Sequence, residues 1–352
     1  MSQWENYILR PEPYVPGEQP AGEKLVKLNT NENPYPPSPK VTLRLETMDA
    51  AAFRKYPDPS ASILTKTLAE NYGIDPSQIF VGVGSDDVLA MAFLTFFHSP
   101  EPVVFPDITY SFYPVWADLF QIPYRQIPLD EQFCIHKEDY YGNNGGVVFP
   151  NPNAPTGLEL PFEDVEDIVA NNPDSVVIVD EAYIDFGGVS VLPLIQKYEN
   201  LLVVQTFSKS RSMAGMRIGY AMGSRKLIEA LENVKYSFNS YTMNQAALEL
   251  GAEAVQDPEY FRNTLDKIIK TREETKAWMR DFGFTFPDSK ANFLFVTHPQ
   301  IDAAELFEAL KKEQIYVRYF PKPRLSSYLR ITIGTDYEMA VLRGFLKRYL
   351  GR

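Results

Sequence analysis

Short apolar runs alternate with helical stretches from about residue 56 to residue 250, and this alternation constrains the fold more than any other feature. Runs of strand length stand at 79–83, 103–105, 147–149, 176–179 and 201–204. Helical patterns lie between some of them, at 86–97 and 161–170. Strand–helix alternation is typical of a mostly parallel sheet with helices on both faces. We therefore predict an α/β fold for this part of the chain.

The pattern changes after about residue 250. The expected elements are a helix from Asp257-Pro258 to Gly283, a strand at 293–296, a helix from Asp302, strands at 315–319 and 329–333, and a helix from Thr335. This mixture predicts a smaller α+β domain. We expect a proline-rich arm at 1–40, a large domain at 41–250 and a small domain at 251–352. The cleft between the two domains is the expected ligand site.

Charge and composition exclude several classes of function. Lys and Arg number 34 against 46 Asp and Glu, so the net charge of −12 argues against nucleic acid or an anionic membrane as a partner. The one cysteine, Cys134, forms no internal disulfide, and the three histidines match no metal-ligand spacing. The first residues, MSQWENYILRPEP, lack a basic start and an apolar stretch. We expect a cytoplasmic protein without a metal.

Polar groups follow three successive strands. The turn Asn151–Gly157 follows the first, Asp180 ends the second, and Lys209 comes shortly after the third. The carboxyl ends of parallel strands meet at one edge of a sheet, where α/β proteins bind ligands. Taken singly, Asp180 could be a helix cap or an ion-paired acid, and Lys209 a surface lysine. Arg217 stands eight residues beyond Lys209 and adds a cation to the set.

The segment Gly82–Asp87 (GVGSDD) begins like a dinucleotide-binding fingerprint but has Asp87 where the third glycine is required. A nicotinamide-dependent dehydrogenase is therefore disfavoured. What remains is a glycine turn before a helix N-terminus, whose free N–H groups suit one phosphate. A purely structural turn is the alternative.

Pyridoxal phosphate is the cofactor that uses such a set. Its chemistry needs a lysine for a Schiff base, an acid that keeps the ring nitrogen protonated, and a phosphate cup. An acid about 4 Å from the pyridinium stabilises it by roughly 4 kcal/mol at an effective dielectric of 20. The lysine amine, once displaced, is a natural general base for moving the substrate proton.

With these residues in place, the chain resembles the class I/II aminotransferases of the fold-type I pyridoxal-phosphate family over almost its whole length. Asp180-x-x-Tyr183, Ser208-Lys209 and Arg217 match the family core in order and spacing. Further matching stretches are 27–34 (KLNTNENP), 54–58 (RKYPD), 84–86 (GSD) and 328–334 (YLRITIG). The resemblance implies a large domain with a mostly parallel seven-stranded sheet, a smaller α+β C-terminal domain, and an arm that packs on the small domain and on a partner subunit.

The resemblance also implies residue roles. Lys209 is expected to bond to the cofactor aldehyde, Asp180 to face the ring nitrogen, Tyr183 to contact the ring 3-oxygen and Tyr110 to stack on the ring. The phosphate is expected to contact Ser85, Asp86, Ser208, Arg217 and the partner subunit's Tyr56, which implies a homodimer with shared sites. Arg330, Arg318 and Tyr14 are expected at the anionic end of the substrate, where guanidinium groups suit a dianion.

The sequence departs from the family at one position. An asparagine usually stands directly before Pro-Thr-Gly and contacts the ring 3-oxygen, but this chain has Ala154 there. We expect Asn153 to take that role. The alternative is that the oxygen relies on Tyr183 alone.

The reaction that the resemblance implies is amino transfer from L-histidinol phosphate to 2-oxoglutarate in histidine biosynthesis, which yields imidazole acetol phosphate and glutamate. An aromatic amino-acid aminotransferase or a phospho-amino-acid decarboxylase on the same scaffold is the alternative. A metabolite-sensing regulator without catalysis is a different class. Such regulators usually carry a DNA-binding module, and an acidic chain of this organisation does not favour one.

Overall fold

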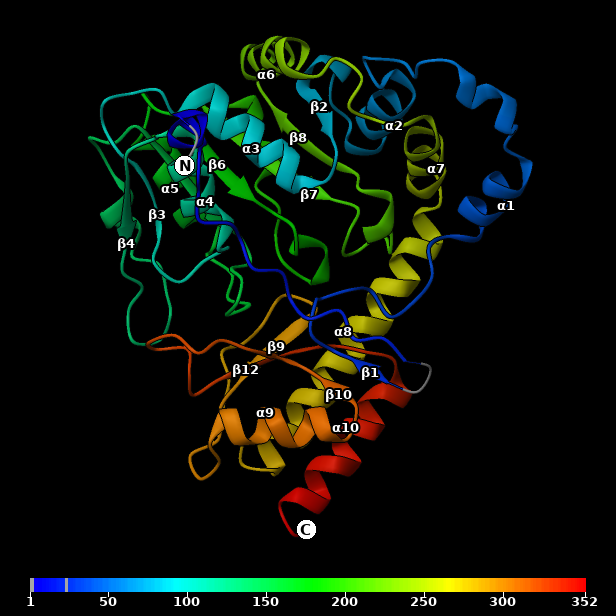
Figure 1. Ribbon diagram of the computed structural model, residues 1–352, viewed down its shortest axis with the longest axis vertical. Coiled ribbons are helices and arrows are strands. Elements are labelled where there is room, and N and C mark those ends of the chain that lie inside the picture. Colours follow the sequence, from blue (N-terminus) through cyan, green and yellow to red (C-terminus); the bar gives the residue numbers. More distant parts are fainter. Residues whose placement is uncertain (1–2, 23–24) are drawn as a thin grey trace.

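The computed structural model describes residues 3–22 and 25–352. Its large part is built on a seven-stranded sheet of order β2-β8-β7-β6-β5-β3-β4 (Figure 1). The strands are β2 (Ile79–Gly82), β3 (Val103–Pro106), β4 (Tyr124–Ile127), β5 (Gly146–Pro150), β6 (Val177–Asp180), β7 (Leu201–Thr206) and β8 (Gly219–Gly223). Every neighbouring pair is parallel except the two that include β8. The prediction of a mostly parallel seven-stranded sheet is confirmed.

Helices cover both faces of this sheet, so its central strands are buried throughout. The helices are α1 (Pro39–Thr47), α2 (Ser62–Tyr72), α3 (Ser85–Phe96), α4 (Phe112–Phe120), α5 (Phe162–Ala170), α6 (Arg225–Phe238) and α7 (Gln245–Val255). Side chains alternate along each strand: Val177 and Val179 pack with α2, α5 and α7, whereas Ile178 packs with α3, α4 and α6. Short 3₁₀ helices occupy 3–7, 50–54, 76–78, 137–140, 184–186, 192–196 and 214–216.

The C-terminal part has its own buried cluster around a three-stranded antiparallel sheet of order β11-β12-β9. Its elements are α8 (Pro258–Asp281), β9 (Phe293–Val296), α9 (Ala303–Lys312), β10 (Ile315–Tyr316), β11 (Arg318–Tyr319), β12 (Leu329–Thr332) and α10 (Asp336–Tyr349). The Asp302-x-x-Glu305 pattern predicts a capping box, but only the Asp302 half of it forms, whereas α10 has the complete motif. Asp302 accepts the N–H groups of Ala304 and Glu305, and Thr335 forms a full capping box with Glu338.

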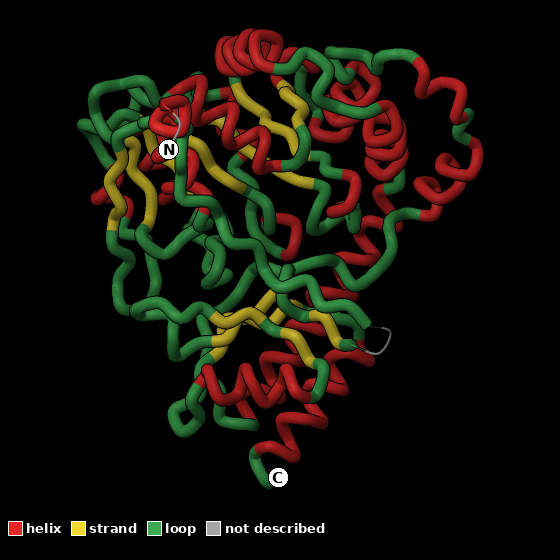
Figure 2. The backbone as a smooth tube through the Cα atoms, in the orientation of Figure 1, coloured by secondary structure: helices red, strands yellow, loops and turns green. Residues whose placement is uncertain are grey.

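The single strand expected at 315–319 is wrong. The segment divides into β10, which pairs in parallel with β1 (Val26–Lys27), and β11, which pairs with β12. The N-terminal arm therefore supplies a strand to the C-terminal part, and it also crosses the large part, where Tyr14 stacks on Phe112 at 4.1 Å. Figure 2 shows this long, mostly irregular segment running between the two parts. The division at 1–40, 41–250 and 251–352 stays a prediction.

Across the described residues, no helix combines the length and the apolar character that a membrane span requires.

One glycine fixes the geometry at the edge of the sheet. A Cβ on Gly219, the first residue of β8, would lie 2.2 Å from the backbone carbon of Gly84 and 2.2 Å from the backbone nitrogen of Ser85. Backbone atoms cannot move aside as the end of a side chain can, so only glycine fits. This contact holds the start of α3 against the end of the sheet.

Replacing Gly219 with alanine should therefore lower the free energy of unfolding by about 3 kcal/mol, because β8 and the 84–85 turn must separate. Gly215→Ala is the matched control, since a Cβ there would meet nothing within 4 Å. Urea denaturation of both variants measures the difference. Equal midpoints for the two variants would contradict the packing account.

Candidate functional site

The two residues expected to do the central chemistry lie at the same edge of the sheet. Asp180 is the last residue of β6 and pairs in parallel register with Val204 of β7. Lys209 follows three residues after the end of β7. The charge of Lys209 acts on the Asp180 carboxyl, so the two groups are near one another. The prediction that Asp180 and Lys209 lie at the same edge of the sheet is confirmed.

Asp180 is held in a buried position with few partners. It is 4% exposed, and its carboxyl accepts hydrogen bonds from the Tyr113 hydroxyl at 3.2 Å and from the Ala182 N–H at 3.2 Å. Burial raises the pKa of Asp180 to about 7, although those two hydrogen bonds and the nearby Lys209 charge lower it. A buried carboxyl with a raised pKa is suited to bind a cationic group.

The neighbouring acid, Glu181, is also buried but is satisfied by the protein. It accepts from the Ser190 hydroxyl at 2.7 Å, the Val191 N–H at 2.7 Å and the Gln205 side chain at 2.8 Å. Burial raises its pKa to about 7 as well. We therefore assign Glu181 to the framework of the sheet edge and Asp180 to the site.

Lys209 and Tyr183 meet beside the acid. The Lys209 Nζ donates to the backbone oxygen of Thr30 at 3.1 Å and lies 5.8 Å from the centre of the Tyr183 ring. Tyr183 is buried, and its hydroxyl accepts a hydrogen bond from the Asn31 side chain at 2.9 Å. The amine is thus loosely held by one carbonyl, which leaves it able to react.

A cup for an anion forms where α3 begins. Arg217 donates to the Ser208 hydroxyl at 3.2 Å and approaches the Asp86 carboxylate at 3.4 Å. A Cβ on Gly84 would lie 2.6 Å from the Arg217 guanidinium, so the turn and the arginine are in close contact. The N-terminus of α3, which starts at Ser85, adds free N–H groups and a positive dipole end.

Tyr110 lies next to this cup. Its hydroxyl donates to the Asp86 carboxylate at 2.6 Å, and the charge of Asp180 also acts on it. Burial raises the pKa of Tyr110 well above its usual value, so it stays a neutral donor. The structure therefore brings together Lys209, Asp180, Tyr183, Tyr110, Ser85, Asp86, Ser208 and Arg217.

A second cationic region comes from the C-terminal part. Arg330 of β12 donates to the Asn29 backbone oxygen at 3.1 Å, and burial lowers the pKa of its guanidinium. Its Nε is buried and finds no hydrogen-bond partner within the part of the chain that the structure describes. Arg318 stands opposite Arg330 in the β11–β12 register, and both Arg318 and Tyr14 interact with it electrostatically. Two guanidinium groups with an unused buried donor fit an anionic ligand group.

Sequence reasoning assigned no role to the segment 29–33, which organises the site. Beyond the contacts of Asn29, Thr30 and Asn31 just described, the Asn33 side chain donates to the backbone oxygens of Lys209 and Ser210, both at 3.1 Å. The signal was the run of short polar side chains, N-T-N-E-N, because such side chains bond readily to nearby backbone groups. The same segment had served only as a mark of resemblance.

Two expected site residues lie differently from the rest. Tyr56 is 82% exposed and stacks on Tyr241 at 4.8 Å, and it shares none of the hydrogen bonds described above. The Asn153 amide donates to the Ile108 backbone oxygen at 3.0 Å and to the Thr156 hydroxyl at 3.1 Å, so it bonds to the loop after β3 and to its own turn. Its buried oxygen has no partner among the described residues. The proposed contact of Asn153 with a ring oxygen stays a prediction.

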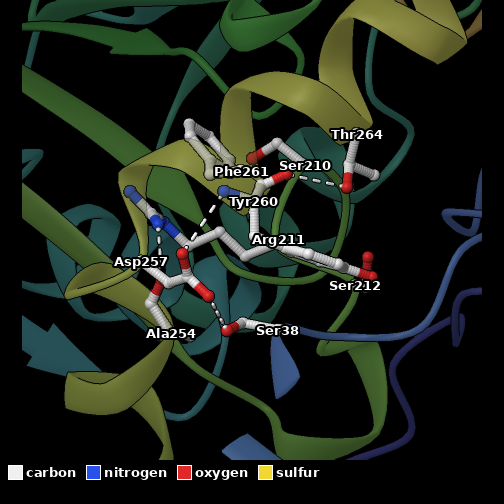
Figure 3. Close-up of a pocket in the computed structure, with 9 residues that line it drawn as sticks. All are labelled: Ser38, Ser210, Arg211, Ser212, Ala254, Asp257, Tyr260, Phe261 and Thr264. Atoms are coloured by element: carbon white, nitrogen blue, oxygen red, sulfur yellow. Dashed lines mark hydrogen bonds between the residues drawn. The ribbon is translucent and has the colours of Figure 1, made fainter. Parts of the chain in front are cut away.

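Figure 3 shows a small cavity lined in part by Ser210, Arg211 and Ser212, the residues that follow Lys209 in the chain. It has a volume of about 10 Å³ and is lined by Ser38, Ser210, Arg211, Ser212, Ala254, Asp257, Tyr260, Phe261 and Thr264. A space of that size accepts about one water. The Arg211 guanidinium lies 4.1 Å from the centre of the Phe261 ring and donates to the Ala254 backbone oxygen. These contacts anchor the chain after Lys209 against α7 and α8. Among the described residues, no group of three or more His, Cys, Asp or Glu side chains could hold a metal ion.

Comparisons with known proteins agree with this geometry. The family model described as aminotransferase class I and II matches residues 23–346. The chain belongs to this family. A histidinol-phosphate aminotransferase of Lactococcus lactis subsp. cremoris is 48% identical over 347 residues, covering 99% of this chain and 98% of the relative. One from Acinetobacter baylyi is 49% identical over 353 residues, with 99% and 98% coverage.

The fold is shared with solved structures at lower identity. The histidinol-phosphate aminotransferase of Sinorhizobium meliloti, solved in complex with pyridoxal-5'-phosphate, superimposes with a TM-score of 0.83 over 93% of this chain and 91% of that one. The two sequences are 24% identical, so this likeness supports the aminotransferase fold alone.

The buried Asp180 makes stability depend on pH in a way that can be measured. Its pKa of about 7 lies above the usual value of 3.8, so the folded protein holds this proton more tightly than the unfolded chain does. Stability contributed by the protonated acid is present below about pH 4 and is lost as pH rises to about 7. In ligand-free protein, Asp180→Asn should be more stable than wild type at pH 8, on the order of 2 kcal/mol, and no more stable at pH 4.

Thermal unfolding at both pH values checks this, with Asp302→Asn, at the exposed cap of α9, as the control. A variant that is destabilised at pH 8 would show that Asp180 is ionised and satisfied without a ligand.

Proposed function

We propose that this aminotransferase uses pyridoxal phosphate to transfer the amino group of L-histidinol phosphate to 2-oxoglutarate, a step of histidine biosynthesis. Relatives about 48% identical over nearly the whole chain carry the name histidinol-phosphate aminotransferase. The observation that carries the proposal is that Lys209 and the buried Asp180 lie at one sheet edge beside an anion cup.

The residues present fit the cofactor. Bound pyridoxal phosphate supplies an aldehyde that condenses with amines and a cationic ring that accepts electrons when a neighbouring carbon loses its proton. Lys209 would hold the aldehyde carbon, and Asp180 would keep the ring nitrogen protonated. Tyr183 would serve the 3-oxygen and Tyr110 the ring face. The phosphate would occupy the cup formed by Ser85, the backbone of Asp86, Ser208 and Arg217.

Asp180 becomes an effective partner because it is buried. Burial disfavours the ionised carboxylate in the ligand-free protein. When a pyridinium binds, the carboxylate has a neighbour of opposite charge, and such a pair interacts more strongly in a low-dielectric site than in water. Tyr113 and the Ala182 N–H keep the carboxyl in place. The negative charge of Asp180 would therefore stabilise the protonated form of the ring nitrogen, and Asp180 would not donate a proton itself.

Lys209 moves the substrate proton. Its amine is part-buried, and its hydrogen bond in this structure is to the carbonyl of Thr30, which accepts a hydrogen bond but has none to donate. Once free of the cofactor, the amine can take the proton from the substrate carbon and return it one position away. The segment 29–33 lies against the lysine, since the Thr30 carbonyl accepts from its amine and the Asn33 side chain donates to its backbone oxygen.

Arg330 and Arg318 bind the anionic ends of both substrates in turn. A phosphate monoester and the carboxylates of 2-oxoglutarate each suit planar, paired guanidinium donors. The Arg330 Nε, which has no hydrogen-bond partner among the described residues, supplies a further donor for such a group. The same two arginines can thus serve both half-reactions.

A homodimer is part of this proposal. Tyr56 lies among large apolar side chains that are exposed in the single chain, with Phe53 at 51%, Phe238 at 72% and Tyr241 at 45%. A second copy covering this surface would bury them and bring the partner subunit's Tyr56 to the phosphate cup. We also propose a cytoplasmic location, which the free, exposed thiol of Cys134 fits.

Purified protein supplied with pyridoxal phosphate should be yellow and should form glutamate from L-histidinol phosphate and 2-oxoglutarate. Lys209→Ala should lose turnover by at least about 10⁴-fold, because both covalent binding and proton transfer depend on that amine. Lys347→Ala, on the exposed face of α10, is the matched control. A wild-type enzyme that prefers phenylalanine as donor would favour the aromatic alternative, and release of carbon dioxide from a phospho-amino acid would favour the decarboxylase.

The arginine pair gives a second prediction. Arg330→Lys keeps the charge but loses the paired donors, so kcat/KM for L-histidinol phosphate should fall roughly 10- to 100-fold. With L-histidinol, which lacks the phosphate, the loss should be much smaller. Arg343→Lys, on the exposed face of α10, controls for the substitution itself. An equal fall in kcat/KM with both substrates would show that Arg330 does not bind the phosphate.

A further inference from the structure

We propose that Asn31 and Thr332 form a positioning pair that aims the hydroxyl proton of Tyr183 at the cofactor's 3-oxygen. This inference rests on the proposed use of pyridoxal phosphate. It goes beyond that proposal, because it concerns two residues that are not proposed to contact the cofactor or the substrate. Their role is to decide which way the tyrosine donates.

The hydrogen bonds between the pair fix the direction of the Asn31 amide. The Asn31 backbone N–H donates to the Thr332 hydroxyl oxygen at 3.0 Å, and the Thr332 hydroxyl donates its one proton to the Asn31 side-chain oxygen at 3.1 Å. The amide oxygen is thereby committed to Thr332, so the NH₂ group faces the Tyr183 hydroxyl at 2.9 Å.

This direction determines what Tyr183 can do. An NH₂ group only donates, so the tyrosine oxygen must accept from Asn31 and its own proton is left for another acceptor. Within the described residues, the Tyr183 hydroxyl donates to no group, although the side chain is 8% exposed. A buried, unused O–H donor beside Lys209 fits an oxyanion on the cofactor ring.

The pair itself is held rigidly. Asn31 is 1% exposed, has a backbone φ of 57°, and its carbonyl accepts from the Asn292 side chain at 3.0 Å. Thr332 is 2% exposed and ends β12, two residues after Arg330, and its N–H donates to the Leu28 carbonyl at 2.9 Å. The tyrosine of the large part is therefore oriented by residues of the arm and of the C-terminal sheet.

Other charged and titratable groups also face this hydroxyl. Lys209 approaches the Tyr183 ring, and Arg330, Tyr110 and Tyr113 interact with it electrostatically. A test must therefore separate the contribution of Asn31 from these. A double-variant cycle with Tyr183→Phe does so, because it removes the hydroxyl through which Asn31 is proposed to act.

The experiment is a pH titration of the bound cofactor's absorbance in the loaded enzyme. Donation from Tyr183 stabilises negative charge on the 3-oxygen and weakens its hold on the neighbouring proton. Asn31→Ala should therefore raise the chromophore's pKa by about 0.5 to 1 unit. Thr332→Val should shift it in the same direction by less, and it keeps the test decisive if Asn31→Ala fails to fold. In the Tyr183→Phe background, neither change should add a further shift.

Asn233→Ala, on the exposed face of α6 where no side-chain hydrogen bond is lost, should leave the titration unchanged. A merely structural role would lower thermal stability while leaving the chromophore's pKa unchanged in both Asn31→Ala and Thr332→Val, and that result would overturn the inference. A shift that persists in the Tyr183→Phe background would overturn it too. A wild-type enzyme that is yellow and transaminates shows that any such failure belongs to the positioning pair and not to the proposed function.

Discussion

The parallel register of β5, β6 and β7 is the constraint on which the rest of the site depends. Pro150 pairs with Asp180, and Asp180 pairs with Val204, so the three strands deliver their carboxyl ends to one edge. The acid is then fixed by the sheet, and the lysine follows within a short loop. Buried apolar side chains on both faces hold this register, since a slip by one residue would exchange the two faces of every strand.

Around this edge, the side chains of Asp180 and Arg330 form no ion pair with any of the described residues. Asp180 accepts two hydrogen bonds and burial raises its pKa, whereas the Arg330 Nε has no partner among the described residues and burial lowers the pKa of that guanidinium. The buried acid suits the cationic ring of the cofactor, and the buried guanidinium suits the anionic end of a substrate. The segment 29–33 links this guanidinium to the lysine, because Asn29 contacts Arg330 and Thr30 contacts Lys209.

Local pattern was sufficient to predict most of the fold. The buried strands read as short apolar runs, and β9 agrees with its expected bounds of 293–296. Two strands of the large sheet gave no such run. β4 is an edge strand with three exposed residues, and β8 contains two glycines in five residues, a composition that weakens strand propensity. Their pairing comes from tertiary context.

Local pattern was also sufficient to predict part of the site. Lys209, Asp180 and Arg217 lie near strand ends, where topology dictates position. The roles of Asn31 and Thr332 were not predictable, because the two residues are 301 positions apart and meet only when the arm lies against β12. Nor does the sequence reveal that the Asn153 amide donates to the Ile108 carbonyl, since the two residues are 45 positions apart and meet only in the folded chain.

The central claim is that the amine of Lys209 bonds to the cofactor aldehyde at this edge of the sheet. Borohydride reduction of the yellow enzyme, followed by digestion and peptide mass analysis, tests it most directly. The account predicts a phosphopyridoxyl mass on the single peptide that contains Thr206, Phe207, Ser208 and Lys209. A label on a different lysine, or a reduced protein that releases all of its cofactor on denaturation, would contradict it.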